Sequence, residues 1–349
     1  MMKRREILKT TLASLMLPML SNGLFANNSN PEIIKPKALK QGDTIGIIAP
    51  ATAVTDPDDI QKAIQVLEYF GLSYKIGKSL MKNDGYKTRT VEDRINDLHD
   101  FFDDDDINGI FCIRGGYGSA QMLDKIDYKL IKKNPKIFLG YSDITAMHLA
   151  ITQNTGLVTF HGPVLLSSFS SITLESFRKT LFSTEPIGTI FNPKILSGIR
   201  PMYPIRTINE GFAKGKLSGG NLSIICSLMG TPFEIDTKDK ILFIEDVGEE
   251  PYRIDRMLTQ LNLAGKLKQA KGIVFGKCAG CDYSSLNSSR IWDSALGEVL
   301  DYQLGNLDLP VFYGLLIGHT NEQFTLPYNI ESEINSELGE LNILEGAVT

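Results

Sequence analysis

The chain has 349 residues and a net charge of -5, from 36 Lys and Arg against 41 Asp and Glu. Hydrophobic residues make up 42% and charged residues 22%, which is the balance of a folded globular protein and not of a disordered one. No basic stripe interleaved with aromatic residues is present, which argues against nucleic acid as a partner. Beyond the N-terminus, no apolar run approaches the roughly 20 residues that span a bilayer.

Residues 1–26 are predicted to be an export signal, because a basic start and a modest apolar stretch are followed by a small residue, Ala26. The pair Arg4-Arg5 resembles a twin-arginine signal, which exports proteins already folded. The alternative is an amphipathic first helix of the mature fold, which Pro18 opposes. No Cys follows the apolar stretch, so we expect no lipid anchor and an exported, periplasmic protein.

Strand and helix patterns alternate through the first half of the chain. A polar segment with two prolines, 27–40, is predicted to be a tether, and 41–164 a first domain. Short apolar runs that end in loops predict buried strands, and apolar residues at helical spacing predict helices between them. The alternation favours a parallel, doubly wound sheet. The predicted strands are 44–50, 107–113 and 137–139, and the predicted helices are 57–70, 91–102, 120–126 and 144–152.

The texture changes after the first domain. Residues 165–206 are rich in Ser, Thr, Pro and Gly, with weak periodicity, and are predicted to connect two domains. Residues 207–349 combine glycine-rich turns, short β-like runs and one clear helix over 252–263, so we expect a second domain of mixed β and α. The predicted fold class is therefore α/β in two domains.

The four cysteines and the acidic runs indicate no metal site. Cys278 and Cys281 have metal or redox spacing, but without a second such pair or a nearby His pair a zinc site is disfavoured. Their oxidation state in an exported protein stays open. Cys112 and Cys226 lie in apolar strings and are expected to be buried thiols. The acidic run 103–106 is expected to be a solvated loop, and no cofactor is predicted.

The strongest local signal is Ser142. A buried strand runs into Gly140, the serine follows, and a helix begins at about Asp143, which is the layout of a nucleophile elbow. A serine there projects above the carboxyl ends of the strands, close to a helix N-terminus that favours developing negative charge. The alternative is that Ser142 or Asp143 only caps the helix.

A glycine-rich loop, 114–118, follows the strand before the elbow strand. Consecutive glycines let the backbone approach a ligand and point N–H groups at an oxyanion. The same loop could be a tight turn or a phosphate cradle. No Lys-Ser/Thr pair follows it, so nucleotide binding is disfavoured.

A serine nucleophile needs a base, and the chain has four histidines. His99 lies on a predicted helix and is expected to face solvent. His148 lies beyond Ser142 on the same helix and is expected to be a core residue. His161 and His319 both follow apolar runs and enter loops, so periodicity leaves both as candidates.

An orienting carboxylate is also required. Glu245 comes directly after the apolar run 241–244, at the end of a predicted strand. The alternative role for Glu245 is a salt bridge to Arg253 or Arg256.

Six segments together resemble the LD-carboxypeptidase family of serine peptidases, which includes peptidases that trim muropeptides and microcin-immunity peptidases. Several long motifs in the family order are far more specific than any one of them, and they extend from about Thr44 to near the C-terminus. The motifs are RGGYGSAQMLDKID (114–127), FLGYSDITAMH (138–148), HGP at His161, SGGNLSIICSLMGTP (218–232), FIEDVGEEPYRIDRML (243–258) and GH at His319.

The resemblance implies a flavodoxin-like N-terminal domain and a C-terminal domain that supplies the Glu and the His. It implies a triad of Ser142, Glu245 and His319, and so selects His319 over His161, which becomes a wall of the pocket. The oxyanion would bind the N–H groups of Gly116 and Asp143.

The implied reaction is hydrolysis of the L,D-amide bond before a C-terminal D-alanine in murein tetrapeptides. The resemblance also implies that no metal is needed and that the protein is a homodimer. We expect Arg114 to bind the terminal carboxylate, because a guanidinium can do so bidentately, with an ordinary ion pair as the alternative. Tyr117 is a further candidate for substrate contact.

Two departures from the family pattern, at 49–52 and at 326–329, weaken the substrate assignment more than the reaction class. A microcin-type or other amide substrate stays open. The rival from another class is an exported solute-binding protein, which needs no triad.

Overall fold

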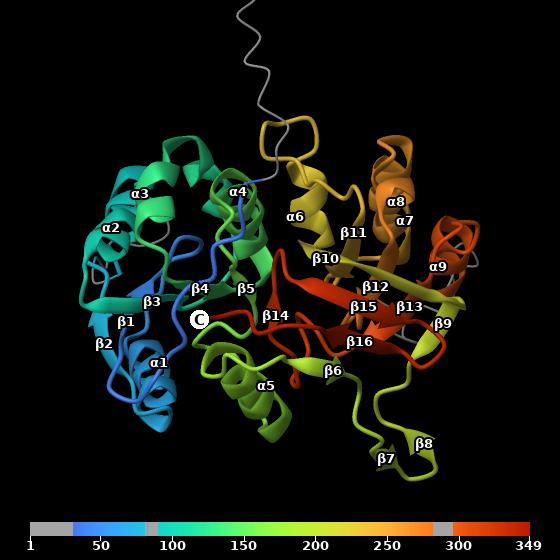
Figure 1. The fold of residues 1–349 in the computed structure, drawn as a ribbon, viewed down its shortest axis with the longest axis horizontal. Coiled ribbons are helices and arrows are strands. Elements are labelled where there is room, and N and C mark those ends of the chain that lie inside the picture. The colour runs from blue at the N-terminus through green and yellow to red at the C-terminus, as the bar shows by residue number, and fades with distance from the viewer. Residues whose placement is uncertain (1–30, 81, 83–89, 282–295) are drawn as a thin grey trace, which may run out of the picture. The chain divides into compact units, whose positions relative to one another are not determined.

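The computed structural model describes residues 31–80, 82, 90–281 and 296–349, and residues 31–349 form one compact unit. The predicted export signal lies outside the described residues. Two β-sheets, each with helices packed against it, make up this unit (Figure 1). Among the described residues, no helix is both long and apolar enough to cross a membrane.

The N-terminal sheet has five parallel strands in the order β2-β1-β3-β4-β5, with β14 added antiparallel to β5. The order 2-1-3-4-5 is that of flavodoxin-like folds, as the resemblance implied. Helices α1 and α5 lie on one face and α2, α3 and α4 on the other (Figure 1). The strands are β1 (Thr44–Ile48), β2 (Ser73–Ile76), β3 (Ile107–Cys112), β4 (Ile137–Gly140), β5 (Phe160–His161) and β14 (Leu326–Pro327). The helices are α1 (Pro57–Tyr69), α2 (Val91–Asp103), α3 (Tyr128–Lys133), α4 (Thr145–Thr155) and α5 (Ser171–Leu181), with 3-10 turns η1 (Ser119–Lys125) and η2 (Ser142–Ile144).

The apolar runs form strands that are buried on both faces, as parallel sheets require. In β1, the side chains of Ile45, Ile47 and Ile48 are at most 1% exposed. A β-carbon at Gly46 would lie 2.3 Å from the ring of Phe101 in α2, so this glycine lets the helix pack directly on the strand.

The C-terminal sheet has eight strands in the order β6-β16-β15-β10-β11-β12-β13-β9. Its centre, β10 to β13, is parallel and its flanks are antiparallel, so the predicted α/β fold with a mixed second domain is confirmed. The strands are β6 (Gly188–Ile190), β9 (Arg206–Asn209), β10 (Phe212–Asn221), β11 (Lys240–Glu245), β12 (Gly272–Gly276), β13 (Val311–Leu315), β15 (Glu331–Asn335) and β16 (Glu340–Ile343). The helices are α6 (Leu222–Ser227), α7 (Pro251–Leu263), α8 (Lys266–Gln269) and α9 (Leu296–Leu304).

The two sheets meet at the end of β10, where Gly220 has no side chain. A β-carbon at Gly220 would lie 2.5 Å from the methyl carbon of Thr145, the first residue of α4. The Thr145 hydroxyl accepts a hydrogen bond of 3.0 Å from the amide of Asn221. The hydroxyl of Tyr328 donates to the carbonyl of Gly219 at 3.0 Å. This contact brings the C-terminal sheet against the predicted elbow.

The described part of the predicted tether, 31–40, is not free but docked on the body. The amide of Ile34 donates to Gly156, and Leu39, 3% exposed, donates its amide to Leu181. The polar composition concealed these apolar anchors. The predicted connecting region, 165–206, contains α5, β6 and a small hairpin, β7 (Leu196–Ser197) with β8 (Arg200–Pro201).

Two of the four cysteines are free and two are bonded to each other. Cys112 and Cys226 are buried free thiols, as predicted. Cys278 and Cys281 form a disulfide in the turn after β12, which settles what the sequence left open. The amide of Gly248, beyond the end of β11, donates to the carbonyl of Ala279 within this turn at 2.8 Å.

Candidate active site

Ser142 lies at a sharp turn between β4 and α4. Its φ is +64°, in the left-handed region, which costs a residue other than glycine about 1–3 kcal/mol and persists where the surroundings enforce it. A β-carbon at Gly115 would lie 3.0 Å from the Ser142 β-carbon, so the neighbouring glycine loop leaves room for the turn. Neither Ser142 nor Asp143 caps a helix with its side chain, which removes the capping alternative.

His319 joins Ser142 to Glu245. Its Nε2 is 3.0 Å from Ser142 Oγ, and its Nδ1 is 2.7 Å from Glu245 Oε2. The backbone amide of His319 donates to the same carboxylate oxygen at 3.3 Å. Glu245, the last residue of β11, is fully buried, whereas the His319 side chain is 18% exposed. The Nε2 atom of His319 therefore contacts the serine, while the carboxylate of Glu245 is buried away from water.

Two opposing effects act on the pKa of His319. Burial, the largest, lowers it, while the hydrogen bond and charge of Glu245 and the charge of Asp246 raise it, and the net pKa lies above the ordinary value. Asp246 is held in place by the Asn221 amide group at 3.1 Å and by the Ser223 hydroxyl at 2.7 Å. A carboxylate fixed next to the imidazole stabilises the imidazolium that forms when a serine gives up its proton.

Two backbone amides lie close to Ser142, one next to it in the chain and one in the neighbouring loop. The N–H groups of Gly116 and Asp143 make no hydrogen bond within the described part of the chain. Gly116 has a φ of +116°, and a β-carbon there would lie 2.2 Å from Thr52 Oγ1. The loop therefore needs glycine at this position, and Thr52 fills the space behind it. Free amides beside a nucleophile are the donors that an oxyanion requires.

Arg114 begins the glycine loop and is half-buried. Its guanidinium makes no ion pair or hydrogen bond with any described residue, so the ion-pair alternative is not seen. Tyr117 in the same loop is 61% exposed, and its amide donates to Thr52 Oγ1 at 3.0 Å. Both side chains are therefore at least partly exposed to solvent in the loop next to Ser142.

This arrangement matches known proteins over most of the chain. Residues 45–162 match the model of the LD-carboxypeptidase N-terminal domain, and residues 214–334 match that of the LD-carboxypeptidase C-terminal domain. The chain belongs to the LD-carboxypeptidase family. Membership makes it a peptidase, and the N-terminal match extends from β1 to β5 while the C-terminal match includes most of the central strands of the second sheet.

Relatives agree with this assignment. A probable murein peptide carboxypeptidase of Bacillus subtilis is 41% identical over 324 residues, which cover 90% of this chain and 97% of the relative. The muramoyltetrapeptide carboxypeptidase of Oxalobacter formigenes superimposes with a TM-score of 0.73 at 30% identity, over 88% of this chain and all of that one. The wild-type apo structure of the microcin C7 self-immunity protein MccF gives 0.81 at 28% identity, over 90% and 100%.

The other histidines of this LD-carboxypeptidase family member make no hydrogen bond with Ser142. His148 is fully buried, with Nε2 2.9 Å from the Gly140 carbonyl oxygen, as expected for a core residue. His161 has no exposed surface and no hydrogen bond among the described residues, so it packs behind the site and does not line a solvent-filled pocket. His99 was expected to face solvent, but it is half-buried and accepts a hydrogen bond from the amide of Asp127 at 2.9 Å.

Tyr141 was missed from the sequence. Its ring meets the ring of His319 edge-on at 4.8 Å and that of His161 at 6.0 Å. Burial raises the pKa of Tyr141, so its phenol stays neutral. Its place directly before the elbow serine was the available signal. Tyr141 thus supports the ring that contacts Ser142.

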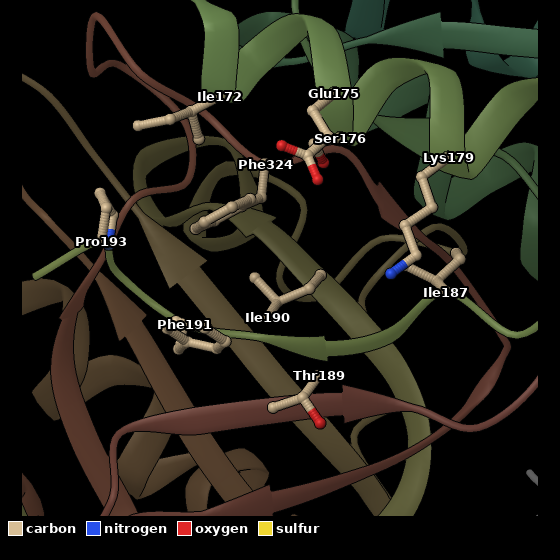
Figure 2. Close-up of a pocket in the computed structure, with 10 residues that line it drawn as sticks. All are labelled: Ile172, Glu175, Ser176, Lys179, Ile187, Thr189, Ile190, Phe191, Pro193 and Phe324. Carbon is tan, nitrogen blue, oxygen red and sulfur yellow. The ribbon is translucent and has the colours of Figure 1, made fainter.

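No group of three or more His, Cys, Asp or Glu side chains is placed to hold a metal ion within the described ranges. A separate cavity of about 210 Å³ lies between α5 and β6, and no residue of the Ser142–His319–Glu245 line contributes to it. Its walls are mainly apolar, with Glu175, Ser176 and Lys179 of α5 on one side (Figure 2). Phe324, beyond the His319 loop, forms part of the wall.

Proposed function

We propose that the chain is a serine-type LD-carboxypeptidase that removes the C-terminal D-alanine from murein tetrapeptides. The observation that carries the proposal is the hydrogen-bonded line from Ser142 through His319 to buried Glu245. The relatives named murein peptide and muramoyltetrapeptide carboxypeptidases support the substrate class.

In the first half of the reaction, Ser142 Oγ attacks the carbonyl carbon of the last amide bond. The hydroxyl proton passes to His319 Nε2, 3.0 Å away, as the C–O bond forms. Glu245, bonded to Nδ1, stabilises the imidazolium. The N–H groups of Gly116 and Asp143 donate to the oxyanion of the tetrahedral intermediate.

The intermediate then collapses and the C–N bond breaks. His319 gives its proton to the leaving nitrogen, and D-alanine departs from the acyl ester on Ser142. A water molecule attacks that ester, again with His319 taking the proton, and releases the tripeptide and the free serine. No step in this sequence requires a metal.

Arg114 is proposed to bind the terminal carboxylate of the substrate. Its guanidinium is unpaired within the described part of the chain and lies in the loop that packs against Ser142. A clamp on this carboxylate and a fixed direction of attack together define which side of the last α-carbon carries the methyl group. This geometry would accept D-alanine and misplace L-alanine.

Purified protein incubated with a panel of muropeptides and followed by mass spectrometry tests the proposal. A tetrapeptide ending in D-alanine should yield the tripeptide, and Ser142→Ala should abolish this while retaining the fold. Ser227→Ala, an exposed serine on α6, is the matched control and should keep full activity. Equal turnover of D- and L-ended peptides would contradict the L,D assignment and favour a broader or microcin-type amide hydrolase. Retention of peptide without cleavage would favour a solute-binding protein.

Export through the twin-arginine route is proposed from Arg4 and Arg5. The Cys278–Cys281 disulfide supports export as such, whatever the route, because disulfide bonds persist in oxidising compartments. Replacing both arginines with Lys should hold the protein in the cytoplasm, as detected by cell fractionation. Unchanged export of that variant would mean that another signal operates.

Homodimerisation is proposed through the hairpin of β7 and β8. Leu196 is 62% exposed and Ile199 94% exposed, and the hairpin projects on the same side of the molecule as α5 and β6 (Figure 1). Pro193, which lines the cavity of Figure 2, lies three residues before the hairpin, and we propose that a second copy related by a two-fold axis covers both surfaces. Light scattering should show a dimer, and Ile199→Asp should give a folded monomer. A monomeric wild type, or a dimer that survives the change, would contradict this surface.

A further inference from the structure

Arg94 on α2 is a buried cation without an ion pair. Its side chain is 6% exposed, and no carboxylate of a described residue lies within ion-pair distance. One terminal nitrogen, Nη1, donates to two carbonyl oxygens, of Pro50 at 2.7 Å and of Gly118 at 2.8 Å. The other, Nη2, donates to Gln121 Oε1 at 2.8 Å. A buried charge is costly, and here backbone carbonyls replace the lost water.

The two carbonyls belong to different loops at the carboxyl ends of β1 and β3. These strands lie side by side where the strand order reverses, which is where open α/β sheets bind ligands. Gly118 follows Gly116 by two residues and has a φ of +119°. Glycine adopts positive and negative φ about equally, so the residue itself does not fix this conformation. The loop must therefore be held by contacts, and Arg94 makes one of them.

The opposite side of the glycine loop is held by the first loop. The amide of Tyr117 donates to Thr52 Oγ1, and the amide of Thr52 donates to the carbonyl of Gly115 at 3.4 Å. Thr52 follows Pro50 by two residues, so Arg94 fixes both the glycine loop and the segment against which it rests.

A second attachment connects the glycine loop to the elbow. The amide of Ser119 donates to the Asp143 carboxylate at 2.8 Å, and its hydroxyl donates to the Asp143 carbonyl at 2.5 Å. Burial lowers the pKa of Arg94, and the negative charge of Asp143 opposes that shift. Because a guanidinium is not deprotonated in proteins, Arg94 is a charged group that contacts the glycine loop carrying the amide of Gly116.

We propose that Arg94 is a positioning residue that sets the distance between these two amide donors and so completes the oxyanion-binding site. The inference rests on the proposed function. A guanidinium can aim two N–H bonds from one nitrogen at two carbonyls in fixed directions, which the single ammonium of lysine does less well. Arg94 touches no reacting atom and acts through the loops.

The test compares kcat and KM of Arg94→Met and Arg94→Lys on a tetrapeptide ending in D-alanine. A displacement of about 1 Å at a reacting centre can cost a hundredfold in rate, so kcat of Arg94→Met should fall about ten- to a hundredfold. KM should change less than about threefold, because the bound substrate carries no oxyanion, which develops only on the way to the tetrahedral intermediate. Arg94→Lys should recover part of the loss. Arg178→Met, an exposed arginine stacked 5.4 Å from the centre of the Tyr69 ring, should leave both constants unchanged.

A loss that appears in KM alone, or wild-type kcat in folded Arg94→Met, would overturn the inference. Should Arg94→Met fail to fold, Gln121→Leu removes only the acceptor of Nη2 and should lower kcat by a smaller factor, about threefold. Unchanged kcat in folded Gln121→Leu and in folded Arg94→Lys would overturn it equally.

Failure of the proposed function is distinguished by a second readout without peptide. A fluorophosphonate reacts when Ser142 Oγ displaces fluoride from phosphorus, and the phosphoryl oxygen then occupies the oxyanion position. If the wild type is labelled at Ser142 but cleaves no tetrapeptide, the substrate assignment is wrong, while the role of Arg94 can still be tested. Labelling of Arg94→Met should still be slower than wild type at equal folded fraction, and equal labelling rates would overturn the role of Arg94.

Discussion

Gly318 and Glu245 lie so close together that a β-carbon at position 318 would be 2.1 Å from the carboxylate oxygen Oε2. Gly318 also has a φ of +76°, in the left-handed region. The glycine before His319 therefore lets the buried carboxylate reach both the ring and the amide of the histidine. Any side chain there would separate Glu245 from His319.

Gly318→Ala should lower kcat/KM by about a hundredfold, because the added methyl group displaces the carboxylate or the imidazole by an ångström or more. The free energy of unfolding should fall by about 1–3 kcal/mol from the left-handed backbone alone. Steady-state kinetics and urea unfolding measure both. Gly230→Ala is the matched control, since Gly230 has a φ of +81° but no neighbour within 4 Å. Equal loss of activity in the two variants would refute the close-contact explanation.

His319→Ala should reduce kcat by about a thousandfold or more, because Ser142 loses its base. His161→Ala should cost less activity, since its ring makes no hydrogen bond with Ser142 and contacts the ring of Tyr141. Kinetics on the two purified variants, with circular dichroism to verify folding, decides between them. A larger loss in His161→Ala would show that the base has been assigned wrongly.

Activity should rise with pH as His319 loses its proton, because only neutral imidazole accepts the proton of Ser142. The pKa of His319 lies above its ordinary value of 6.5, so half-maximal kcat/KM should fall above pH 6.5. Glu245→Gln removes the main opposing effect to burial and should move this midpoint to lower pH while lowering kcat. A midpoint that stays in place in Glu245→Gln would contradict the assignment of the titrating group to His319.

Stability should fall as the pH drops below 6.5, because buried His148 must stay neutral in the fold. Burial lowers its pKa to about 4, so the unfolded chain takes up the proton first. The contribution is complete above pH 6.5 and is lost progressively toward pH 4, by about 2 kcal/mol at pH 5. Urea unfolding at pH 7.5 and 5 should show a smaller difference for His148→Phe than for wild type. Burial also lowers the pKa of His161, so part of the dependence of the unfolding free energy on pH should remain in that variant. An equal difference in unfolding free energy between pH 7.5 and pH 5 in the two proteins would show that His148 does not contribute.

Arg114→Gln should raise KM for a tetrapeptide with a free terminal carboxylate by about ten- to a hundredfold, from loss of a charge-assisted pair. The same peptide with an amidated C-terminus should be a poor substrate for wild type and no poorer for the variant. Kinetics of both peptides on both proteins form a complete cycle. An equal effect of the substitution on both peptides would place Arg114 outside the carboxylate site.

The local elements of the fold could be predicted because each is encoded by neighbouring residues. The run Thr44–Ile48 forms a buried strand, and Gly140 ends the strand that leads to Ser142. The elbow itself follows from a buried strand, Gly140 and a helix start within a few residues. Periodicity detects such patterns because they do not depend on distant parts of the chain.

Long-range relationships could not be read in this way. Residue patterns alone left His161 and His319 as equal candidates, because which of them meets Ser142 depends on how the two sheets dock at Gly220. The cation Arg94 looked like an ordinary helix residue, since its partners Pro50 and Gly118 are far along the chain. The docked segment 31–40 was masked by its polar composition, although its backbone bonds to both Gly156 and Thr349.

Strand β14 seals the outer edge of the N-terminal sheet by pairing Leu326 and Pro327 with His161 and Phe160. This sheet is therefore completed by residues that follow Ser142, Glu245 and His319 in the chain. A nascent chain that has already made Ser142, Glu245 and His319 still presents an open β-edge to its neighbours. The three residues of the hydrolytic centre are therefore all synthesised before the strand that protects this edge against edge-to-edge aggregation.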